Sequence, residues 1–252
     1  MTIGLAVLAF VLGTVFGSFI NCMAWRMVHK ESVLHGRSHC AECGHTLSAL
    51  DLVPVWSWLF LRGRCRYCGK KISPRYVLAE LLLGAVFAAA FLRLGLSWAT
   101  LRAMGLFCAL LGLSLVDLDI QEIPDQFLVF GILWWLAFVF LMPEGIRDGM
   151  LNGIAAALGI GGGMLMITLG FEKVTKKESM GGGDIKLLFV VSLYLGPLVG
   201  LMNLILACIV GLVFVYFMRV QKIPFGPSIS IATVGCLLFG TAMVDWYAGF
   251  FR

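Results

Sequence analysis

The chain has 252 residues, of which 60% are hydrophobic and only 13% charged, and its mean hydropathy is +0.96. A soluble domain keeps roughly a quarter of its residues charged, so this composition excludes an ordinary soluble protein and indicates an integral membrane protein. The net charge of +5 does not call for nucleic acid as a partner, because an excess of Lys and Arg also marks the inner side of a membrane protein.

The first expected element is an uncharged apolar stretch at residues 3–25. A helix rises about 1.5 Å per residue, so about 20 such residues cross a hydrocarbon core roughly 30 Å thick. The stretch is too long for the core of a signal peptide and lacks a basic start. We therefore expect a spanning helix that is retained.

The one sizeable polar region follows, at residues 27–75, and it contains two Cys-x2-Cys pairs separated by twenty-one residues. The pairs are Cys40 with Cys43 and Cys65 with Cys68. Two such pairs supply the four thiolates of a closed tetrahedral zinc site, so the sequence predicts a structural Zn²⁺ rather than a catalytic one. Two disulfides or a thiol redox centre of the membrane oxidoreductase type are the alternatives, and a reducing cytosol disfavours both.

Seven further spanning helices are expected after the polar region. Residues 187–218 are too long for one ordinary span, and Gly196-Pro197 is expected to divide them into a short helix and a full one. The predicted fold class is an all-α polytopic membrane protein with about eight helices and a four-cysteine insertion between helices one and two. The apolar stretches behind this count are residues 76–92 (with Glu80), 98–116 (with Arg102), 126–143, 149–171, 187–218 and 223–244.

The distribution of Lys and Arg orients these helices. Nine of the 19 basic residues lie in residues 26–75, and eight helices that start outside place fifteen of the 19 inside and four outside. Basic residues concentrate on the cytosolic side. We therefore expect the N-terminus outside, the cysteine-bearing region in the cytosol and, in a bacterium, a location in the inner membrane.

Several of the 14 acidic residues gather at helix ends on this predicted inner side. Carboxylates at a membrane border are costly to desolvate and are functional by default. Asp117 and Asp119 close one expected helix, Asp125 opens the next, and Asp184 opens another after a run of glycines. Asp125 also fits an ordinary helix start, and Asp119 also fits a solubilising loop residue.

Two carboxylates brought together can share one proton, so that one acts as a base toward water while the other polarises a scissile carbonyl. Gly181 and Gly183 remove side chains where an extended peptide would lie close to the backbone near Asp184. Such a pair predicts aspartyl proteolysis. A transporter of ions or protons is the alternative from another class. Placement of the key acids on one face, beside a cytosolic cysteine module, argues against it.

Further segments join the cysteine pairs and the aspartates as recognisable motifs: residues 17–21 with Arg26, residues 51–54, 57–65 and 72–76, Glu80, and Pro224-Phe225-Gly226-Pro227. Taken together, these motifs resemble the bacterial type IV prepilin peptidases, which are bifunctional leader peptidases and N-methyltransferases of the GxGD membrane protease class. The resemblance covers nearly the whole chain. Ala41 departs from the proline that the family often has there, and this change does not threaten metal binding.

The resemblance implies a catalytic pair. The first aspartate lies eight residues before the aspartate of an Ile-Pro-Asp motif, which makes it Asp117 before Asp125, and Asp119 is its main rival. The second is Asp184 of Gly-x-Gly-Asp. Supporting roles fall to Gly181, Gly183, Lys186 and Asp125. The implied division is residues 1–26 as a first helix, 27–75 as a zinc-binding region associated with methyl transfer, and 76–252 as the protease core.

The resemblance also implies the substrate, a prepilin or pseudopilin of a type IV pilus or type II secretion system that sits in the lipid bilayer. The bond after a glycine, usually before phenylalanine, is cut at the cytosolic face, and the new amine is methylated with S-adenosyl-L-methionine. No Rossmann-type glycine loop appears, so Glu80 is the candidate for the cofactor site or for orienting the amine. The alternative role for Glu80 is an ion pair with Arg75 or Arg26. The alternative activity for the chain is that of a peptidase without methyltransferase activity.

Overall fold

The computed structural model describes residues 2–33, 35–141, 146–176, 180–218 and 224–249. These residues form helices and loops, with two isolated β-bridges and no strand within the described ranges. Contacts divide the chain into two compact units, Met1–Gly95 and Leu96–Arg252. The helix that carries Glu80 thus belongs with the cysteine-bearing region. The functional division expected at residue 76 stays a prediction.

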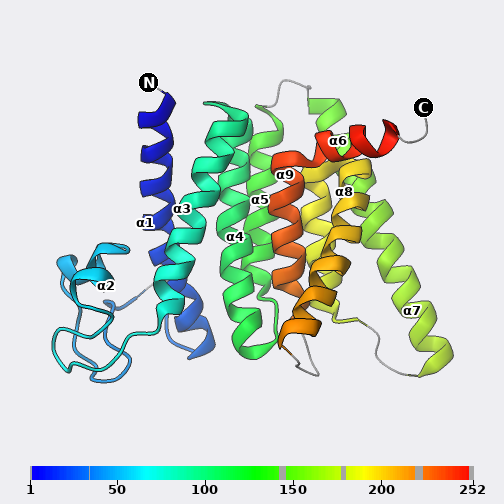
Figure 1. Cartoon of the computed structure of the whole chain (residues 1–252). Helices are drawn as coiled ribbons and strands as arrows, with labels where there is room; N and C mark the ends of the chain where they lie inside the picture. The colour runs from blue at the N-terminus through cyan, green and yellow to red at the C-terminus, as the bar shows by residue number, and fades with distance from the viewer. Residues whose placement is uncertain (1, 34, 142–145, 177–179, 219–223, 250–252) are drawn as a thin grey trace. The chain divides into compact units, whose positions relative to one another are not determined.

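The first unit is built on two long helices that pack side by side (Figure 1). A Cβ added at Gly13 would lie 2.7 Å from the Cα of Gly84, and one added at Gly17 would lie 2.8 Å from the Cα of Glu80. Small residues therefore allow the two backbones to approach closely, as is common between membrane helices. The elements are α1 (Thr2–Val28), η1 (Ala49–Leu52), α2 (Trp56–Phe60) and α3 (Pro74–Leu94).

The second unit is a bundle in which α4 packs against α5 and α9, and α8 packs against α6 and α9. Gln121 adopts the left-handed conformation and ends α4, and Pro124 immediately precedes α5. Because the loop between them is this short, α4 and α5 are antiparallel neighbours. The elements are α4 (Trp98–Ile120), α5 (Asp125–Val139), α6 (Ile146–Ala156), the π-helical η2 (Ala157–Gly162), α7 (Gly163–Thr175), α8 (Gly182–Met218) and α9 (Phe225–Gly249).

Helix α8 turns back on itself at Gly196, where φ is 72° and ψ is 179°. A straight helix of 37 residues would be about 55 Å long. Gly226 is the eighth residue after the end of α8, and eight residues span at most about 28 Å. Gly183, at the start of α8, and Gly226 nevertheless both lie close to the side chain of Ile123. The two parts of α8 must therefore run in opposite directions, which confirms the break expected at Gly196-Pro197.

Six helical segments of the described ranges are long and apolar enough to cross a membrane, and α5 is a shorter apolar helix. The six include α8 as one segment, so its two parts and α5 bring the number of apolar helical segments to eight. The predicted fold class, an all-α polytopic membrane protein with a four-cysteine insertion after the first helix, is confirmed.

Candidate functional site

Two of the predicted aspartates meet in the second unit. Asp117 lies in the last turn of α4 with 4% of its surface exposed, and Asp184 lies in the first turn of α8. The two carboxyl groups are close enough to interact electrostatically. Asp119, two residues beyond Asp117, is exposed, because two residues rotate a side chain by about 200° around a helix. The structure therefore brings Asp117 and Asp184 together and leaves Asp119 outside.

Glycines allow three helix ends to converge at this pair. A Cβ added at Gly226, at the start of α9, would lie 2.6 Å from Oδ2 of Asp117, and one added at Gly181 would lie 3.1 Å from Oδ2 of Asp184. A Cβ at Gly183 would lie 3.0 Å from Cβ of Ile123. Gly183 therefore allows Ile123 to pack closely, and the expectation that Gly181 and Gly183 make room for an extended peptide stays a prediction.

The backbone N–H of Gly226 donates a hydrogen bond to Oδ2 of Asp117 across 3.0 Å. Gly226 is in the first turn of α9, where N–H groups have no partner within the helix and a carboxylate is favoured. Sequence reasoning quoted Pro224-Phe225-Gly226-Pro227 only as a resemblance and missed this contact. The available signal was a glycine with a free N–H placed beside a proline, which has none.

Hydroxyl groups fix the start of α9 against α4. The hydroxyl of Ser230 donates to the carbonyl of Gly226 across 2.8 Å, and the hydroxyl of Ser114 donates to Ser230 Oγ across 2.9 Å. Ser230 is buried and Ser114 is half-buried, so water competes little for these bonds. The direction of the Gly226 N–H toward Asp117 is therefore set by packing and hydrogen bonding together.

The other two predicted supporting residues form a surface ion pair. Nζ of Lys186 lies 2.8 Å from Oδ1 of Asp125, and both side chains are exposed. Such pairs contribute little to stability, but this one joins the start of α8 to the start of α5. The idea that Lys186 adjusts the electrostatics of Asp184 stays a prediction.

The four cysteines of the polar region form a candidate metal centre. Their Sγ atoms all lie within 4.8 Å of one another. Metal–sulfur bonds of about 2.3 Å in a tetrahedron place sulfur atoms about 3.8 Å apart, so the donor set fits Zn²⁺. All eight cysteines of the chain lie in described segments and are free thiols, which gives the disulfide alternative no support.

The two cysteine pairs are folded alike, as a short repeat offset by 25 residues, from position 40 to position 65. In each, the N–H of the first cysteine donates to the carbonyl five residues later, and the glycine after the second cysteine adopts a positive φ that favours glycine. The distances are 3.0 Å from Cys40 to His45 and 2.9 Å from Cys65 to Lys70, and φ is 68° at Gly44 and 70° at Gly69.

The thiols of this cluster compete for protons. Burial acts to raise the pKa of the Cys40 thiol, but hydrogen bonds from the backbone of Cys43 and Glu42 and from neighbouring thiols lower it to about 7. A backbone hydrogen bond from Lys70 lowers the pKa of Cys68, whereas burial and the surrounding thiols raise it, to about 11. A divalent cation binds the thiolate form and so displaces these protons.

Asp51, which lies between the two cysteine pairs, contacts residues on both sides of it in the sequence, including two residues within the second pair. Its Oδ2 accepts hydrogen bonds from the hydroxyl of Ser48 across 2.7 Å and from Tyr67 across 3.2 Å. Its Oδ1 lies 2.9 Å from Nε of Arg66. The Ser48 hydroxyl, with further help from Arg66, lowers the pKa of Asp51 below its usual value.

The first unit also contains a cavity of about 780 Å³ that reaches from the cysteine cluster to α1 and α3. Glu80 lines it and is buried. Its Oε2 accepts the backbone N–H of Val55 across 2.7 Å, and the Ser18 side chain hydrogen-bonds the same carboxyl group. Val55 has a φ of 63°, which is strained for a β-branched residue. Trp58 and Tyr76 add aromatic surface to the lining.

Arg26 does not pair with Glu80, so the Arg26 form of that alternative was wrong, while its Arg75 form stays a prediction. Its guanidinium donates to the carbonyls of Ser32, His35 and Gly36 across 3.1, 3.3 and 3.0 Å. A buried cation usually needs such partners. Through these hydrogen bonds Arg26 fixes the first loop after α1. Glu80 instead contacts Val55 and Ser18, so its carboxyl faces the cavity without a basic partner from Arg26.

The fold and the carboxylate pair define the class: a polytopic membrane protein with paired acids at converging helix ends. Residues 11–94 match the bacterial peptidase A24 N-terminal domain, and residues 104–216 match the type IV leader peptidase family. The gap between these matches falls at the boundary between the two compact units.

Several curated relatives carry the name prepilin leader peptidase/N-methyltransferase. That of Aeromonas hydrophila is 32% identical over 278 residues, covering 95% of this chain and 92% of the relative. That of Burkholderia pseudomallei (strain K96243) is 34% identical over 268 residues, covering 92% and 85%. That of Bacillus subtilis (strain 168) is 29% identical over 245 residues, covering 94% and 96%. Among solved structures there is no match. The chain belongs to the prepilin leader peptidase/N-methyltransferase family.

Proposed function

We propose that this chain cleaves the leader peptide from type IV prepilins or pseudopilins with Asp117 and Asp184 and then N-methylates the new terminal residue. The observation that carries the peptidase half is the meeting of a buried Asp117 with Asp184 where α4, α8 and α9 converge. The names of the relatives support both halves.

In the proposed cleavage, the two carboxyl groups hold one proton between them, because two adjacent carboxylates do not both ionise readily. The unprotonated carboxylate takes a proton from water as the water oxygen attacks the carbonyl carbon of the scissile bond. The protonated carboxyl gives its proton to the carbonyl oxygen. The tetrahedral intermediate then collapses: the C–N bond breaks, the leaving amine receives a proton from one carboxyl group, and a hydroxyl of the intermediate returns a proton to the other carboxylate, so the pair again holds one proton.

The chemistry of the substrate agrees with the surroundings of this pair. The segment before Asp184 carries three glycines, and a Cβ added at Gly182 would meet no atom within 4 Å, so this position leaves room for an extended peptide against the backbone. A glycine before the scissile bond presents no side chain to this segment. The basic residues of the chain support placing this end of the helices at the cytosolic face of the inner membrane.

For the methyltransferase half, we assign the reaction to the cavity of the first unit. A volume of about 780 Å³ is in the range of small-molecule sites. Trp58 and Tyr76 offer faces on which an adenine ring stacks. S-adenosyl-L-methionine, when bound, supplies an electrophilic methyl group. Glu80 orients the substrate amine and accepts its proton, which frees the nitrogen lone pair for the transfer.

A zinc ion held by the four cysteines would stabilise one wall of this cavity, since Cys40 and Cys65 both line it. Four thiolates would leave no open coordination position, so the role of the ion would be structural.

The test is mass spectrometry of a prepilin-like substrate incubated with membranes that contain this protein and S-adenosyl-L-methionine. Loss of the leader together with a gain of one methyl group supports both halves. Loss of the leader without a gain of a methyl group supports the proposed peptidase activity and contradicts the proposed methyltransferase activity. An intact substrate, with zinc bound and the protein folded, contradicts the proposal and favours a transporter that uses the carboxylates.

A second experiment isolates Glu80. Glu80→Gln keeps the hydrogen bond acceptor for Val55 but removes the proton acceptor, so we expect methylation to be lost while cleavage persists. Binding of S-adenosyl-L-methionine to the purified variant gives a readout that is independent of turnover. Glu31→Gln is the matched control, because Glu31 is an exposed acid of the same unit. Equal methylation by both variants would remove Glu80 from the reaction.

A further inference from the structure

The short helix α2 presents an apolar face outward. Trp56, Leu59 and Phe60 are 61%, 52% and 80% exposed, and the rings of Trp56 and Phe60 stack with centroids 6.1 Å apart. At about 100° per residue, these three side chains fall within an arc of about 100°. The opposite face, with Ser57, Trp58 and Leu61, lines the cavity. The outward face is therefore apolar without serving the core of the unit.

The level of α2 along the spanning helices places this face at a membrane boundary. The N–H of Val55, just before α2, is bonded to Glu80, and Glu80 packs against Gly17 of α1. Glu80 is six residues beyond Pro74, where α3 begins, which is about 9 Å along the helix axis. Helices that lie in a membrane interface bury their apolar face by about 5–10 Å.

The surroundings of α2 have the composition of an interfacial segment. Phe19 of α1, two residues from Gly17, is also exposed, so a spanning helix of the same unit presents an apolar side chain near the level of Glu80. Arg62 and Arg64 follow α2 directly and are exposed. Aromatic side chains favour the membrane–water interface, and nearby basic residues are attracted to anionic headgroups.

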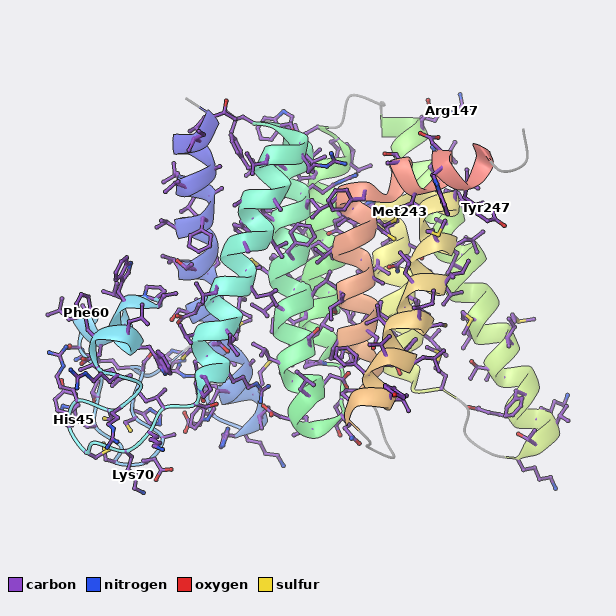
Figure 2. All side chains as sticks on the ribbon, in the orientation of Figure 1. His45, Phe60, Lys70, Arg147, Met243 and Tyr247 are labelled. Atoms are coloured by element: carbon purple, nitrogen blue, oxygen red, sulfur yellow. The ribbon has the colours of Figure 1, made fainter. Side chains whose placement is uncertain are left out.

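Figure 2 shows which edge of the cysteine-bearing region carries this face. Phe60 lies on the upper side of the region in this view, level with the middle of α1, whereas His45 and Lys70 lie on its lower side, toward the level at which α1 ends. The exposed aromatic side chain and these two polar side chains thus lie on different sides of the region.

We propose that α2 lies in the lipid interface, with Trp56, Leu59 and Phe60 in contact with acyl chains and Arg62 and Arg64 in contact with anionic phosphate headgroups. The cysteine-bearing region is then a membrane-anchored element rather than a loop surrounded by water. This inference rests on the chain spanning a membrane and does not depend on the proposed catalytic roles.

Site-specific photo-crosslinking in the full chain tests this. The photoreactive residue p-benzoyl-phenylalanine replaces Phe60 in one variant, His45 in a second and Leu92, an exposed residue of the spanning helix α3, in a third. Each protein is reconstituted in vesicles of phosphatidylethanolamine and phosphatidylglycerol, irradiated, and analysed by intact mass. We expect phospholipid adducts at positions 60 and 92 and a several-fold lower yield at position 45.

An absence of lipid adducts at position 60, with adducts present at position 92, would overturn the proposal. A crosslink from position 60 to a second copy of the chain, or to an added prepilin, would also overturn it and would assign the face to a protein. A second measurement avoids the unnatural residue: quenching of Trp fluorescence by brominated lipids is compared between the parent and Trp56→Phe. The parent should show the larger fractional quenching, and equal quenching would contradict lipid contact.

Discussion

The backbone N–H of Gly226 donates a hydrogen bond to Oδ2 of Asp117, and the two residues are separated by 109 positions in the chain. The Gly226 N–H thereby orients the carboxyl group through a rigid backbone group rather than a flexible side chain. A Cβ at Gly226 would come within 2.6 Å of the same oxygen. The backbone of α9 can therefore approach Asp117 closely enough for the hydrogen bond only because residue 226 has no side chain.

Gly226→Ala should therefore abolish most of the cleavage activity. The new methyl group must displace the Asp117 carboxyl or the start of α9, and a displacement of about 1 Å in a reacting group can cost about 100-fold in rate. The measurement is the initial rate of leader removal from a prepilin-like substrate in membranes.

Gly235→Ala is the matched control for Gly226→Ala. Gly235 lies in the same helix, and a Cβ there would meet no atom within 4 Å, so the variant should retain near-parental activity. Ala also has a better helix propensity than Gly. Equal rates for the two variants would show that the approach of Gly226 to Asp117 has no part in catalysis.

Asp117→Asn and Asp184→Asn should each reduce cleavage by about 1,000-fold or more, because general acid and base catalysis contributes about 100- to 10,000-fold. Asp119→Asn is the control, since Asp119 is exposed. Protein levels in the membrane should remain unchanged in all three. Substantial activity in either of the first two variants would refute the paired-acid mechanism.

Substitution of Cys40 or Cys65 by Ser should lower the zinc content of the purified protein from one ion per chain. We expect methylation to fall more than cleavage, because both cysteines line the cavity of the first unit whereas the aspartates lie in the second. Zinc is measured by elemental mass spectrometry, with Cys208→Ser in α8 as the control. Equal loss of the two activities would indicate that the cysteine-bearing region docks the substrate.

Asp51→Asn should weaken the cysteine-bearing region and speed the release of zinc to a chelator. The folded-state pKa of Asp51 lies below its ordinary value, mainly through the Ser48 hydroxyl. Its charge therefore contributes stability that is fully present above the unfolded pKa and is lost only as the pH falls through the lower folded value. At neutral pH the parent has the whole contribution and the variant has lost it. Unchanged zinc release at pH 7 would contradict this role.

Much of the architecture could be predicted from the sequence because the bilayer imposes simple requirements. Length and apolarity give the spanning helices, and Gly196-Pro197 marks the turn in α8. The pairing of Cys40 and Cys43 with Cys65 and Cys68 follows from the geometry of a four-thiolate site. The meeting of Asp117 with Asp184 was available only through resemblance, since nothing local in either segment specifies the other.

The remaining features depend on contacts between backbone atoms and distant side chains. Periodicity does not reveal that the N–H of Gly226 faces a carboxylate, or that the N–H of Val55 is held by Glu80. The shared Cys-x2-Cys-Gly pattern of the two cysteine pairs is visible in the sequence, but the matching hydrogen bonds from Cys40 to His45 and from Cys65 to Lys70 are not. Such features arise from tertiary packing and become visible only in three dimensions.

Helix α9, which supplies Gly226, follows α4 and α8 in the chain, and this has a consequence for the order in which the proposed catalytic pair is assembled. When Asp117 and Asp184 have both entered the membrane, Gly226 still has to be synthesised and α9 still has to dock. Asp117 thus acquires its backbone donor only after both aspartates have been synthesised. A chain whose production stops before α9 would insert in the membrane with the proposed catalytic pair incomplete.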